Sequence, residues 1–344
     1  MDMTFLPMVG EGNRFRGTDF SVLYYGRAYP SGGFGFRNGL SSFREDVKMG
    51  LLRDFIRIFH ILKGSSFDII ISVGDPFNLL FTGLGTHKKV FFISTDQGHS
   101  GWVRGFNSVE RRLLRRYARW IFTRDRKTLE VLNDRGFRNV SYLGNPLMDC
   151  VEEPRFSLPK GITLLPGTRK DCWKNLNYLL DIIKEVPEDY NYYVPVNTNS
   201  ESIILEALKK SYKLLKWDYG YMIDISRRVY IGKDIFSEMV NSSILVLGLS
   251  GSGNEQAAGL GKPVVSFYIN GIQYNEKFIN EQKRLLGDAL ILSKREDTTS
   301  TINELLRDPE GLERRGMVGR ERMGEKGAIP RISEFIMGLV YESR

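Results

Sequence analysis

The residues with the clearest capacity for chemistry lie between two short apolar runs, at positions 244–247 and 264–267. They are Ser250, Gly251, Ser252, Gly253, Asn254 and Glu255. The apolar runs predict strands and the segment from about Asn254 predicts a helix, so the six residues form a loop and a first helical turn. The free N–H groups of such a turn point at the loop, and glycine lets a ligand approach the backbone closely. The pattern predicts a diphosphate site or, without a ligand, a simple capped turn.

Glu255 falls in the first turn of that predicted helix, where the helix dipole favours a carboxylate. Its two oxygens can also accept hydrogen bonds from two ribose hydroxyls. The glycine spacing differs from GxGxxG and from GxxxxGK[ST], so neither a dinucleotide fingerprint nor a P-loop is indicated.

Other candidates lie in loops after predicted strands, because ligands of open parallel sheets lie beyond the carboxyl ends of the strands. Asp75 stands before Pro76 at the start of a helix, where it is either an N-cap or a general base. The polar loop at 94–102 contains Asp96 and His99 and is either a flexible lid or an edge of an acceptor site.

Two further candidates belong to the second half of the chain. Arg169 follows an apolar strand, and its guanidinium can bind phosphate oxygens in bidentate fashion; the alternative is a surface arginine in a turn. Gly232 ends another strand, where the backbone can contact the edge of a nucleobase.

Alternating apolar and amphipathic segments predict the architecture that positions these residues. Strands are expected at 4–9, 20–25, 68–73, 89–94, 120–123, 162–165, 192–196, 228–231, 244–247, 264–267 and near 289–292. Helices are expected at 43–62, 110–120, 175–184, 202–215, 234–241, 299–306 and 331–341. Continuous apolar strands separated by helices indicate parallel sheets covered on both faces. The stretch 151–161, with two prolines and mixed charge, reads as a linker, so we expect two doubly wound α/β domains at 1–150 and 161–330.

Composition sets the outer limits of function. The 344 residues hold two cysteines, Cys150 and Cys172, and three scattered histidines, a set that favours neither a disulfide framework nor a zinc site. No apolar run approaches the roughly 20 residues that span a bilayer, and the first residues do not resemble a secretory signal. These features predict a cytoplasmic protein.

The net charge of +8 is concentrated in the predicted helix at 110–120. Its basic residues are Arg111, Arg112, Arg115, Arg116 and Arg119. Nucleic acid, an anionic membrane surface and a merely solvated face are the three interpretations. Because no nucleic-acid motif accompanies the helix, we favour a membrane surface or a solvated face, with no nucleic-acid partner.

Five motifs, read in order, resemble those of lipid-A-disaccharide synthase and its less characterised relatives. They are GNPLMD at 144–149, LPGTR at 165–169, SGSGNE at 250–255, GKPVV at 261–265 and QYNEKF at 273–278. Members of that family are GT-B glycosyltransferases that act on UDP-sugars. The resemblance implies two Rossmann-like domains facing across a cleft, the nucleotide sugar held by the second, and a C-terminal helix, 331–344, packing back on the first.

The resemblance also implies roles for individual residues. Asp75 stands where the family has a candidate catalytic aspartate, Arg169 where it has the arginine that contacts the diphosphate, and Glu255 where it has the acidic residue near the ribose. Gln273, in the last motif, is expected to join the nucleotide-sugar site. The chain begins at a segment that resembles the family's second strand, so its first βα unit is expected to be missing.

The function predicted from these features is an inverting, metal-independent transfer of a sugar from a UDP-sugar to a lipid-linked or glycolipid acceptor. Asp75 is the expected base, with His99 as a second catalytic candidate. No cofactor is expected, because an arginine and a helix N-terminus can balance the charge of the leaving diphosphate without a metal. The protein would then attach peripherally to the inner face of the membrane. Two alternatives remain: an isomerase like the UDP-N-acetylglucosamine 2-epimerases, and a nucleotide-sugar-binding protein without catalysis.

Overall fold

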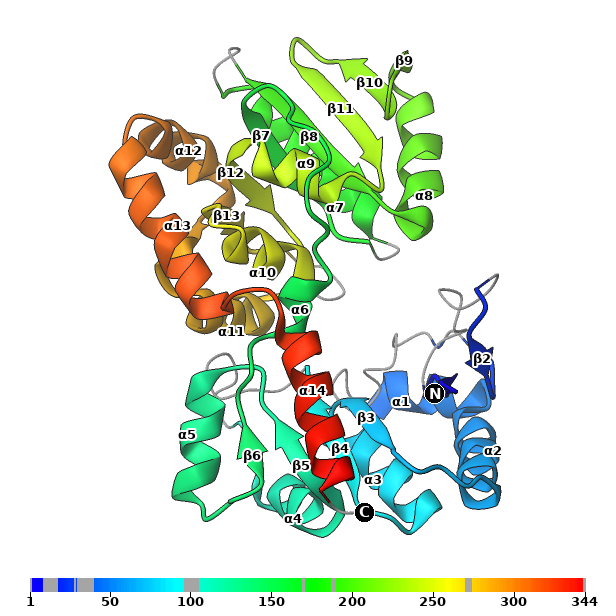
Figure 1. Cartoon of the computed structure of the whole chain (residues 1–344). Helices are drawn as coiled ribbons and strands as arrows, with labels where there is room; N and C mark the ends of the chain where they lie inside the picture. The colour runs from blue at the N-terminus through cyan, green and yellow to red at the C-terminus, as the bar shows by residue number, and fades with distance from the viewer. Residues whose placement is uncertain are drawn as a thin grey trace. The chain divides into compact units, whose positions relative to one another are not determined.

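The computed structural model describes residues 2–8, 18–27, 29, 40–95, 105–168, 171–186, 190–269 and 274–342, with the side chains of 40–42 and 198–199 left out. Contacts divide the chain into two compact units (Figure 1). The first comprises Met1–Asp96, Phe106–Phe122 and Phe137–Ser141, and the second comprises Gln97–Gly105, Thr123–Gly136 and Tyr142–Arg344. The predicted packing of a C-terminal helix on the first domain concerns the relative placement of the units and stays a prediction.

The first unit is built on a sheet whose described strands are all parallel and run in the order β3-β4-β5-β6. These are β3 (Ile71–Gly74), β4 (Val90–Ser94), β5 (Ala118–Phe122) and β6 (Val140–Ser141). Helices α3 (Pro76–Thr86) and α4 (Ser108–Tyr117) connect them. The predicted burial is confirmed for β4 and β5, where Val90, Phe92 and Ile121 are fully buried. It is wrong for β3, where Ile71 and Val73 are 47% and 53% exposed.

The helix predicted over 43–62 is wrong as a single element. The chain forms α1 (Leu40–Lys48) and α2 (Leu51–Gly64), separated at Gly50, whose φ of 101° lies in the left-handed region. Glycine adopts that conformation without the steric cost of a side chain, so the helix breaks where the sequence offers it. The predicted apolar face of α2 is confirmed, with Phe55 and Ile58 buried.

The first unit also contains a separate two-stranded parallel sheet. It joins β1 (Thr4–Phe5) to β2 (Ser21–Val22). Both strands are shorter than the segments 4–9 and 20–25 predicted from apolar content. Phe5 and Phe20 meet edge to face at 5.0 Å between ring centroids, which holds the two segments together.

The second unit contains a larger sheet with the strand order β14-β13-β12-β7-β8-β11-β10-β9. The parallel strands are β7 (Gly161–Leu165), β8 (Asn191–Val196), β11 (Arg228–Lys233), β12 (Ser243–Gly248), β13 (Val264–Phe267) and β14 (Leu290–Ser293). The remaining two, β9 (Leu215–Trp217) and β10 (Gly220–Asp224), pair antiparallel at one edge.

Helices cover both faces of this sheet (Figure 1). They include α7 (Cys172–Ile183), α8 (Thr198–Lys209), α9 (Phe236–Asn241), α10 (Ser252–Gly259), α11 (Glu276–Leu286), α12 (Thr298–Leu306) and α13 (Pro309–Met323), with short 3-10 turns at Gly287–Ala289 and Arg295–Asp297. Leu245 and Leu247 of β12 pack into the core under α7, α8 and α12, whereas Val246 packs into the core under α9, α10 and α13. Alternate residues of one strand therefore supply two cores, as a doubly wound sheet requires.

The second unit contains three more helices, two that precede its sheet in the sequence and one at its C-terminal end. They are α5 (Arg126–Asp134), α6 (Pro146–Asp149) and α14 (Ala328–Tyr341). The backbone N–H groups of Gly327 and Ile329 donate to the carboxylate of Asp149, and Arg331 donates from Nε to the carbonyl of Leu143 at 2.8 Å. These bonds attach the start of α14 to the segment around α6.

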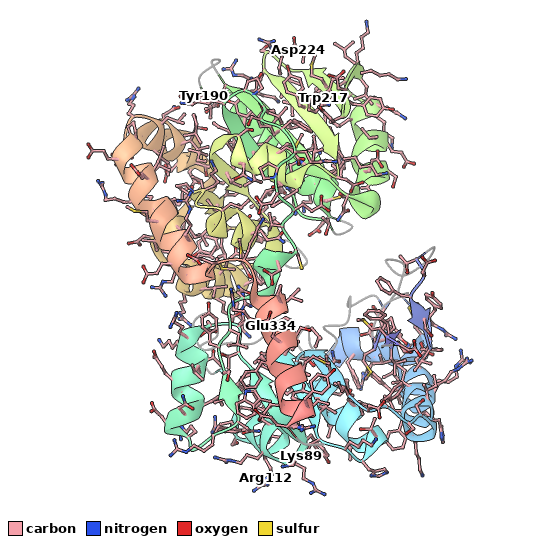
Figure 2. The ribbon with its side chains drawn as sticks, in the orientation of Figure 1. Lys89, Arg112, Tyr190, Trp217, Asp224 and Glu334 are labelled. Carbon is pink, nitrogen blue, oxygen red and sulfur yellow. The ribbon has the colours of Figure 1, made fainter. Side chains whose placement is uncertain are left out.

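The helix predicted at 202–215 ends early, and the edge hairpin β9–β10 follows it. The segment 202–215 was expected to be helical throughout, but α8 ends at Lys209 and Leu215 begins a strand. Trp217, labelled in Figure 2, packs edge to face against Tyr219 and Tyr230 at 5.2 and 5.0 Å between ring centroids. Aromatic packing of this kind stabilises the hairpin that follows the helix.

Candidate functional site

The strand order of the larger sheet creates a place for a ligand. The chain builds β7, β8 and β11 in one direction and then returns to place β12 on the other side of β7. The connections that follow β7 and β12 therefore leave the sheet in opposite directions. At such a switch point a crevice opens beyond the carboxyl ends of the two strands, which is where open α/β sheets bind ligands.

A pocket occupies this position. One wall follows β7 and consists of Pro166, Gly167, Thr168, Asp171 and Asn175. The other wall follows β12 and consists of Leu249, Ser250, Gly251 and Ser252, and Tyr274 completes the lining. The sequence pattern identified the β12 wall, and it identified the β7 wall through Arg169 in the loop after the strand and through the motif at 165–169. Asp171, Asn175 and Tyr274 were missed, although the first two follow directly from the rule that ligands lie after strands.

Helix α10 begins at Ser252, so its first turn faces the pocket-lining loop. Gly251 is the N-cap residue and makes no side-chain cap bond. The leading N–H groups of a helix lack intrahelical partners and carry the positive end of the dipole, which attracts anions. The predicted strand, loop and helix around Ser250–Ser252 are thus present, and the arrangement can hold a phosphate group.

Asn254, predicted to contact the nucleotide, lies beneath the loop and is fully buried. Its amide nitrogen contacts the carbonyl of Gly248, the hydroxyl of Tyr274 and Oε1 of Gln282, at 3.3, 3.0 and 3.0 Å. Burial raises the pKa of Tyr274 well above its ordinary value, so this hydroxyl keeps its proton and can donate. These contacts give Asn254 a structural role, because its buried amide supports the pocket loop.

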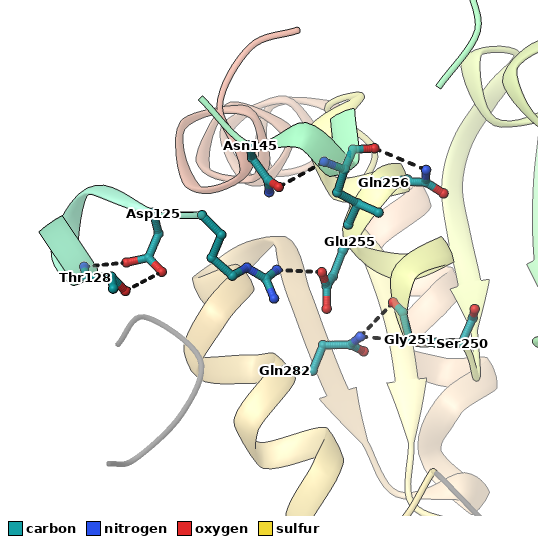
Figure 3. A network of polar contacts seen from close by, with 10 residues as sticks. Asp125, Thr128, Asn145, Ser250, Gly251, Glu255, Gln256 and Gln282 are labelled. Carbon is teal, nitrogen blue, oxygen red and sulfur yellow. Dashed lines mark hydrogen bonds and ion pairs between the residues drawn. The ribbon is translucent and has the colours of Figure 1, made fainter. Parts of the chain in front are cut away.

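Glu255 has an ion-pair partner from a distant part of the second unit, as Figure 3 shows. Its Oε2 accepts from Nη2 of Arg124 at 2.7 Å, and the two side chains are only 15% and 7% exposed. The next residue, Asp125, caps α5 by accepting from the N–H and hydroxyl of Thr128. Arg124 was not singled out from the sequence, because nothing local marks an arginine at the end of a strand as the partner of a residue 131 positions away.

Two predicted site residues lie where a structural role explains them. Gly232 is in β11, where a Cβ would lie 2.4 Å from Ile235 and 2.6 Å from Met239, so glycine allows α9 to pack closely. Gly253 lies in the first turn of α10, where a Cβ would lie 2.8 Å from Oγ of Ser250. Neither observation tests a contact with a nucleotide.

Asp75, in the first unit, is the N-cap of α3. Its Oδ1 accepts from the N–H groups of Phe77 at 3.0 Å and of Asn78 at 3.1 Å, with Pro76 in the first turn. This confirms the helix start predicted from the sequence. A role as a base stays a prediction. His99, Arg169 and Gln273, also predicted to act at the site, lie outside the described residues.

The basic helix α4 ends at Tyr117, two residues before Arg119, which belongs to β5 and stacks over the ring of Phe91. The expectation that Arg119 shares the polar face of the helix is therefore wrong. Arg111 donates to the carbonyl of Phe106, whereas Arg112, Arg115 and Arg116 are exposed. Arg112 is labelled in Figure 2.

Metal and membrane features can be stated for the described part of the chain. There, no cluster of three or more His, Cys, Asp or Glu residues is placed to hold a metal ion. In the same residues, no helix combines the length and the apolar character needed to cross a bilayer.

Comparison with known proteins shows the fold. No protein-family model matches the chain, and no curated protein matches it. The calicheamicin glycosyltransferase CalG4 is similar in structure, with a TM-score of 0.59 and 11% identity over 97% of this chain and 90% of that one. A putative UDP-N-acetylglucosamine 2-epimerase from Listeria monocytogenes has a TM-score of 0.56 and 18% identity over 85% and 79% of the two chains. The MnaA protein of S. aureus, solved with UDP, has a TM-score of 0.56 and 17% identity over 84% and 79%.

These similarities, together with the two mainly parallel sheets, establish a GT-B type α/β fold of two Rossmann-like domains. The fold class predicted from the sequence is confirmed. None of the three proteins is a lipid-A-disaccharide synthase, so membership of that narrower family stays a prediction.

Proposed function

We propose that this chain is an enzyme that binds a UDP-sugar, with the diphosphate in the pocket between the loops after β7 and β12. The observation that carries the proposal is the place of this pocket, at the switch point of the sheet and at the N-terminus of α10. The similarity to MnaA, whose structure holds UDP, supports the choice of nucleotide. Arg169 and Gln273 remain proposed ligands of the same nucleotide sugar.

The two walls of the pocket differ in chemistry, and this difference orients the ligand. The β12 wall offers N–H groups and the hydroxyls of Ser250 and Ser252, which can donate to phosphate oxygens. The β7 wall includes the carboxylate of Asp171, which repels phosphate and accepts hydrogen bonds from hydroxyl groups. We therefore place the phosphates against α10 and a hydroxyl-bearing part of the ligand against the start of α7.

Two reactions are compatible with this binding mode. Epimerisation of UDP-N-acetylglucosamine at C2 is favoured by similar structures such as the enzyme from Listeria monocytogenes, and it is the first reaction to test. Sugar transfer, the reaction favoured by the sequence motifs, is supported by the coverage of CalG4 over nearly the whole chain. Incubation with UDP-N-acetylglucosamine alone separates them, because an epimerase forms the 2-epimer without an acceptor. Formation of sugar product only when a lipid-linked or glycolipid acceptor is added would instead establish transfer.

A charge placed in the first turn of α10 tests the diphosphate site. Ser252→Asp should weaken UDP binding at least tenfold, on the order of what a like charge near a bound anion costs. The same carboxylate interacts favourably with the helix dipole, so the melting temperature of the free protein should stay the same or rise. Isothermal titration with UDP and thermal unfolding measure the two effects. The neutral variant Ser252→Asn is the control and should bind UDP within about threefold of wild type, because the Asn amide can also donate to a phosphate oxygen.

An unchanged UDP affinity in Ser252→Asp would place the diphosphate elsewhere. Absence of UDP binding by the wild-type protein, in a panel that also includes GDP, dTDP and their sugars, would contradict the proposed nucleotide.

The exposed arginines of α4 lead to a separate proposal, that the protein attaches to anionic membrane surfaces. Replacing Arg112, Arg115 and Arg116 with Gln should remove salt-sensitive binding to phosphatidylserine vesicles, at about 1 kcal/mol per residue. Vesicle sedimentation at two salt concentrations measures the effect. A control with equal loss of charge, Arg307→Gln, Arg314→Gln and Arg322→Gln, should bind as wild type does. Equal binding by both triple variants would mean that α4 only presents a solvated face.

A further inference from the structure

The side chain of Gln282, on α11, binds the backbone of the pocket loop. The side chain is 3% exposed, and its amide nitrogen donates to the carbonyls of Ser250 and Gly251 at 3.2 and 3.0 Å (Figure 3). Both carbonyls belong to residues that line the pocket. The amide therefore fixes the direction of the Ser250 carbonyl, and it shares the Gly251 carbonyl with the backbone N–H of Glu255, which donates to it at 3.3 Å.

The orientation of the Gln282 amide is itself determined by its neighbours. Its oxygen Oε1 accepts from the amide nitrogen of Asn254 and from the hydroxyl of Tyr274, each at 3.0 Å. Exchanging the nitrogen and oxygen positions would set an NH₂ group against the Asn254 amide and a carbonyl oxygen against two other carbonyls. The hydroxyl of Tyr274 also lies 2.7 Å from Oγ of Ser266, whose own proton is directed at the carbonyl of Gly248 at the end of β12.

The direction of these carbonyls decides what the loop offers to a ligand. In a planar trans peptide the C=O of one residue and the N–H of the next point in opposite directions. With the carbonyls of Ser250 and Gly251 held toward Gln282, the N–H groups of Gly251 and Ser252 point away from it. A loop with the reverse orientation would present carbonyl oxygens to the ligand and repel a phosphate.

We propose that Gln282 is a positioning residue for phosphate binding: it turns the Ser250–Ser252 loop so that its N–H groups, and not its carbonyls, meet the diphosphate. This inference rests on the proposed function of the pocket and adds a residue that makes no contact with the ligand itself. It identifies the part of the ligand that Gln282 affects, which is the diphosphate and not the nucleoside.

The test compares UDP with uridine, which lacks the diphosphate. Gln282→Met keeps the length of the side chain and loses the donor, and Gln282→Glu keeps the shape but cannot donate to both carbonyls. We expect either variant to bind UDP about 10- to 100-fold more weakly, the scale of two lost hydrogen bonds, with uridine affinity changed less than about threefold. Gln256→Met is the matched control, because that glutamine donates to the carbonyl of Leu147, outside the pocket lining, and should leave both affinities unchanged.

Hydrogen exchange on the wild-type protein tests the same inference without a substitution, in case both variants fold poorly. UDP should slow exchange in the segment 250–252, and uridine should not. Gln282 variants with the wild-type ratio of UDP to uridine affinity would overturn the role of Gln282 and leave the proposed function intact. Wild-type protein that binds UDP without this protection would overturn the role of Gln282 together with the placement of the diphosphate at this loop. Failure of the wild-type protein to bind UDP at all would instead contradict the proposed function.

Discussion

Asp75→Asn is expected to reduce turnover of a UDP-sugar about 100-fold while the melting temperature stays the same, if Asp75 takes a proton in the reaction. In the structure, this substitution preserves the helix cap while it changes the chemistry of the side chain. Asp75 caps α3 through its Oδ1, and Asn offers an oxygen at the same place and caps helices as well as Asp does. The variant therefore loses the ability to accept a proton and keeps the helix start. Product formation followed by NMR and thermal unfolding of the same preparation measure both properties.

Two comparisons define the outcome for Asp75. Asp308→Asn is the matched control, because Asp308 caps α13 by accepting from the N–H of Gly311 at 2.9 Å and has no proposed role in catalysis. Asp75→Ala removes cap and base together and should also lower the free energy of unfolding by about 1 kcal/mol. Should Asp75→Asn turn over its substrate at the wild-type rate, Asp75 is only a helix cap. The base would then have to be sought in the loop that contains His99.

The parallel strands of the second unit could be predicted from the sequence because they are short, mainly apolar runs, whereas the antiparallel strands β9 and β10 were not predicted. β12 and β13 are buried between helices on both faces, so apolar residues predominate in them and no regular alternation of apolar and polar residues obscures the pattern. The loop and helix between β12 and β13 could be predicted equally well, because glycines and serines are typical of such a turn. Two doubly wound α/β domains followed from this alternation, the GT-B type followed from the resemblance of the motifs, and the structural similarities confirm the fold class.

Elements whose stability comes from tertiary contacts were not predicted. Helix α13 contains Gly316 and Gly319, which argue against a helix on propensity. In the structure a Cβ at either residue would lie 2.3 Å from a carbonyl oxygen, of Gly261 and of Ala258 respectively. The glycines thus permit close packing against the end of α10, a contact that no local pattern reveals.

Only part of the lining of the candidate site was predicted from the sequence, for a similar reason. Ser250, Gly251 and Ser252 lie in one recognisable loop, but the opposite wall comes from the segment after β7, about 80 residues earlier. Only the strand order, with β7 beside β12, brings the walls together, and strand order is not written in the apolar pattern. Gln282 was missed because it contacts two backbone carbonyls, and a contact with the backbone produces no recognisable sequence pattern.

The pair of Arg124 and Glu255 gives the largest expected effect on stability. Both side chains are nearly buried, so removing one charge leaves the other in a place from which water is largely excluded. Arg124→Met should therefore lower the free energy of unfolding by about 3 kcal/mol, the usual scale for breaking a buried ion pair. Glu255→Gln should be costly for the same reason. The double variant should recover at least about 1 kcal/mol of the summed losses, because neither charge is then left behind.

Denaturant unfolding of the wild type, both single variants and the double variant completes the cycle. The pair of Asp181 and Lys184 provides a surface comparison, since its side chains are 56% and 49% exposed at a similar separation of 2.9 Å. Its coupling should fall below about 1 kcal/mol. UDP titrations of the same proteins separate stability from binding: Glu255→Gln should also weaken UDP about 10- to 100-fold if its carboxylate accepts ribose hydroxyls, the scale of a charged hydrogen bond. Additive losses in the cycle would show that the 2.7 Å contact contributes little, and unchanged UDP affinity in Glu255→Gln would leave this carboxylate a purely structural role.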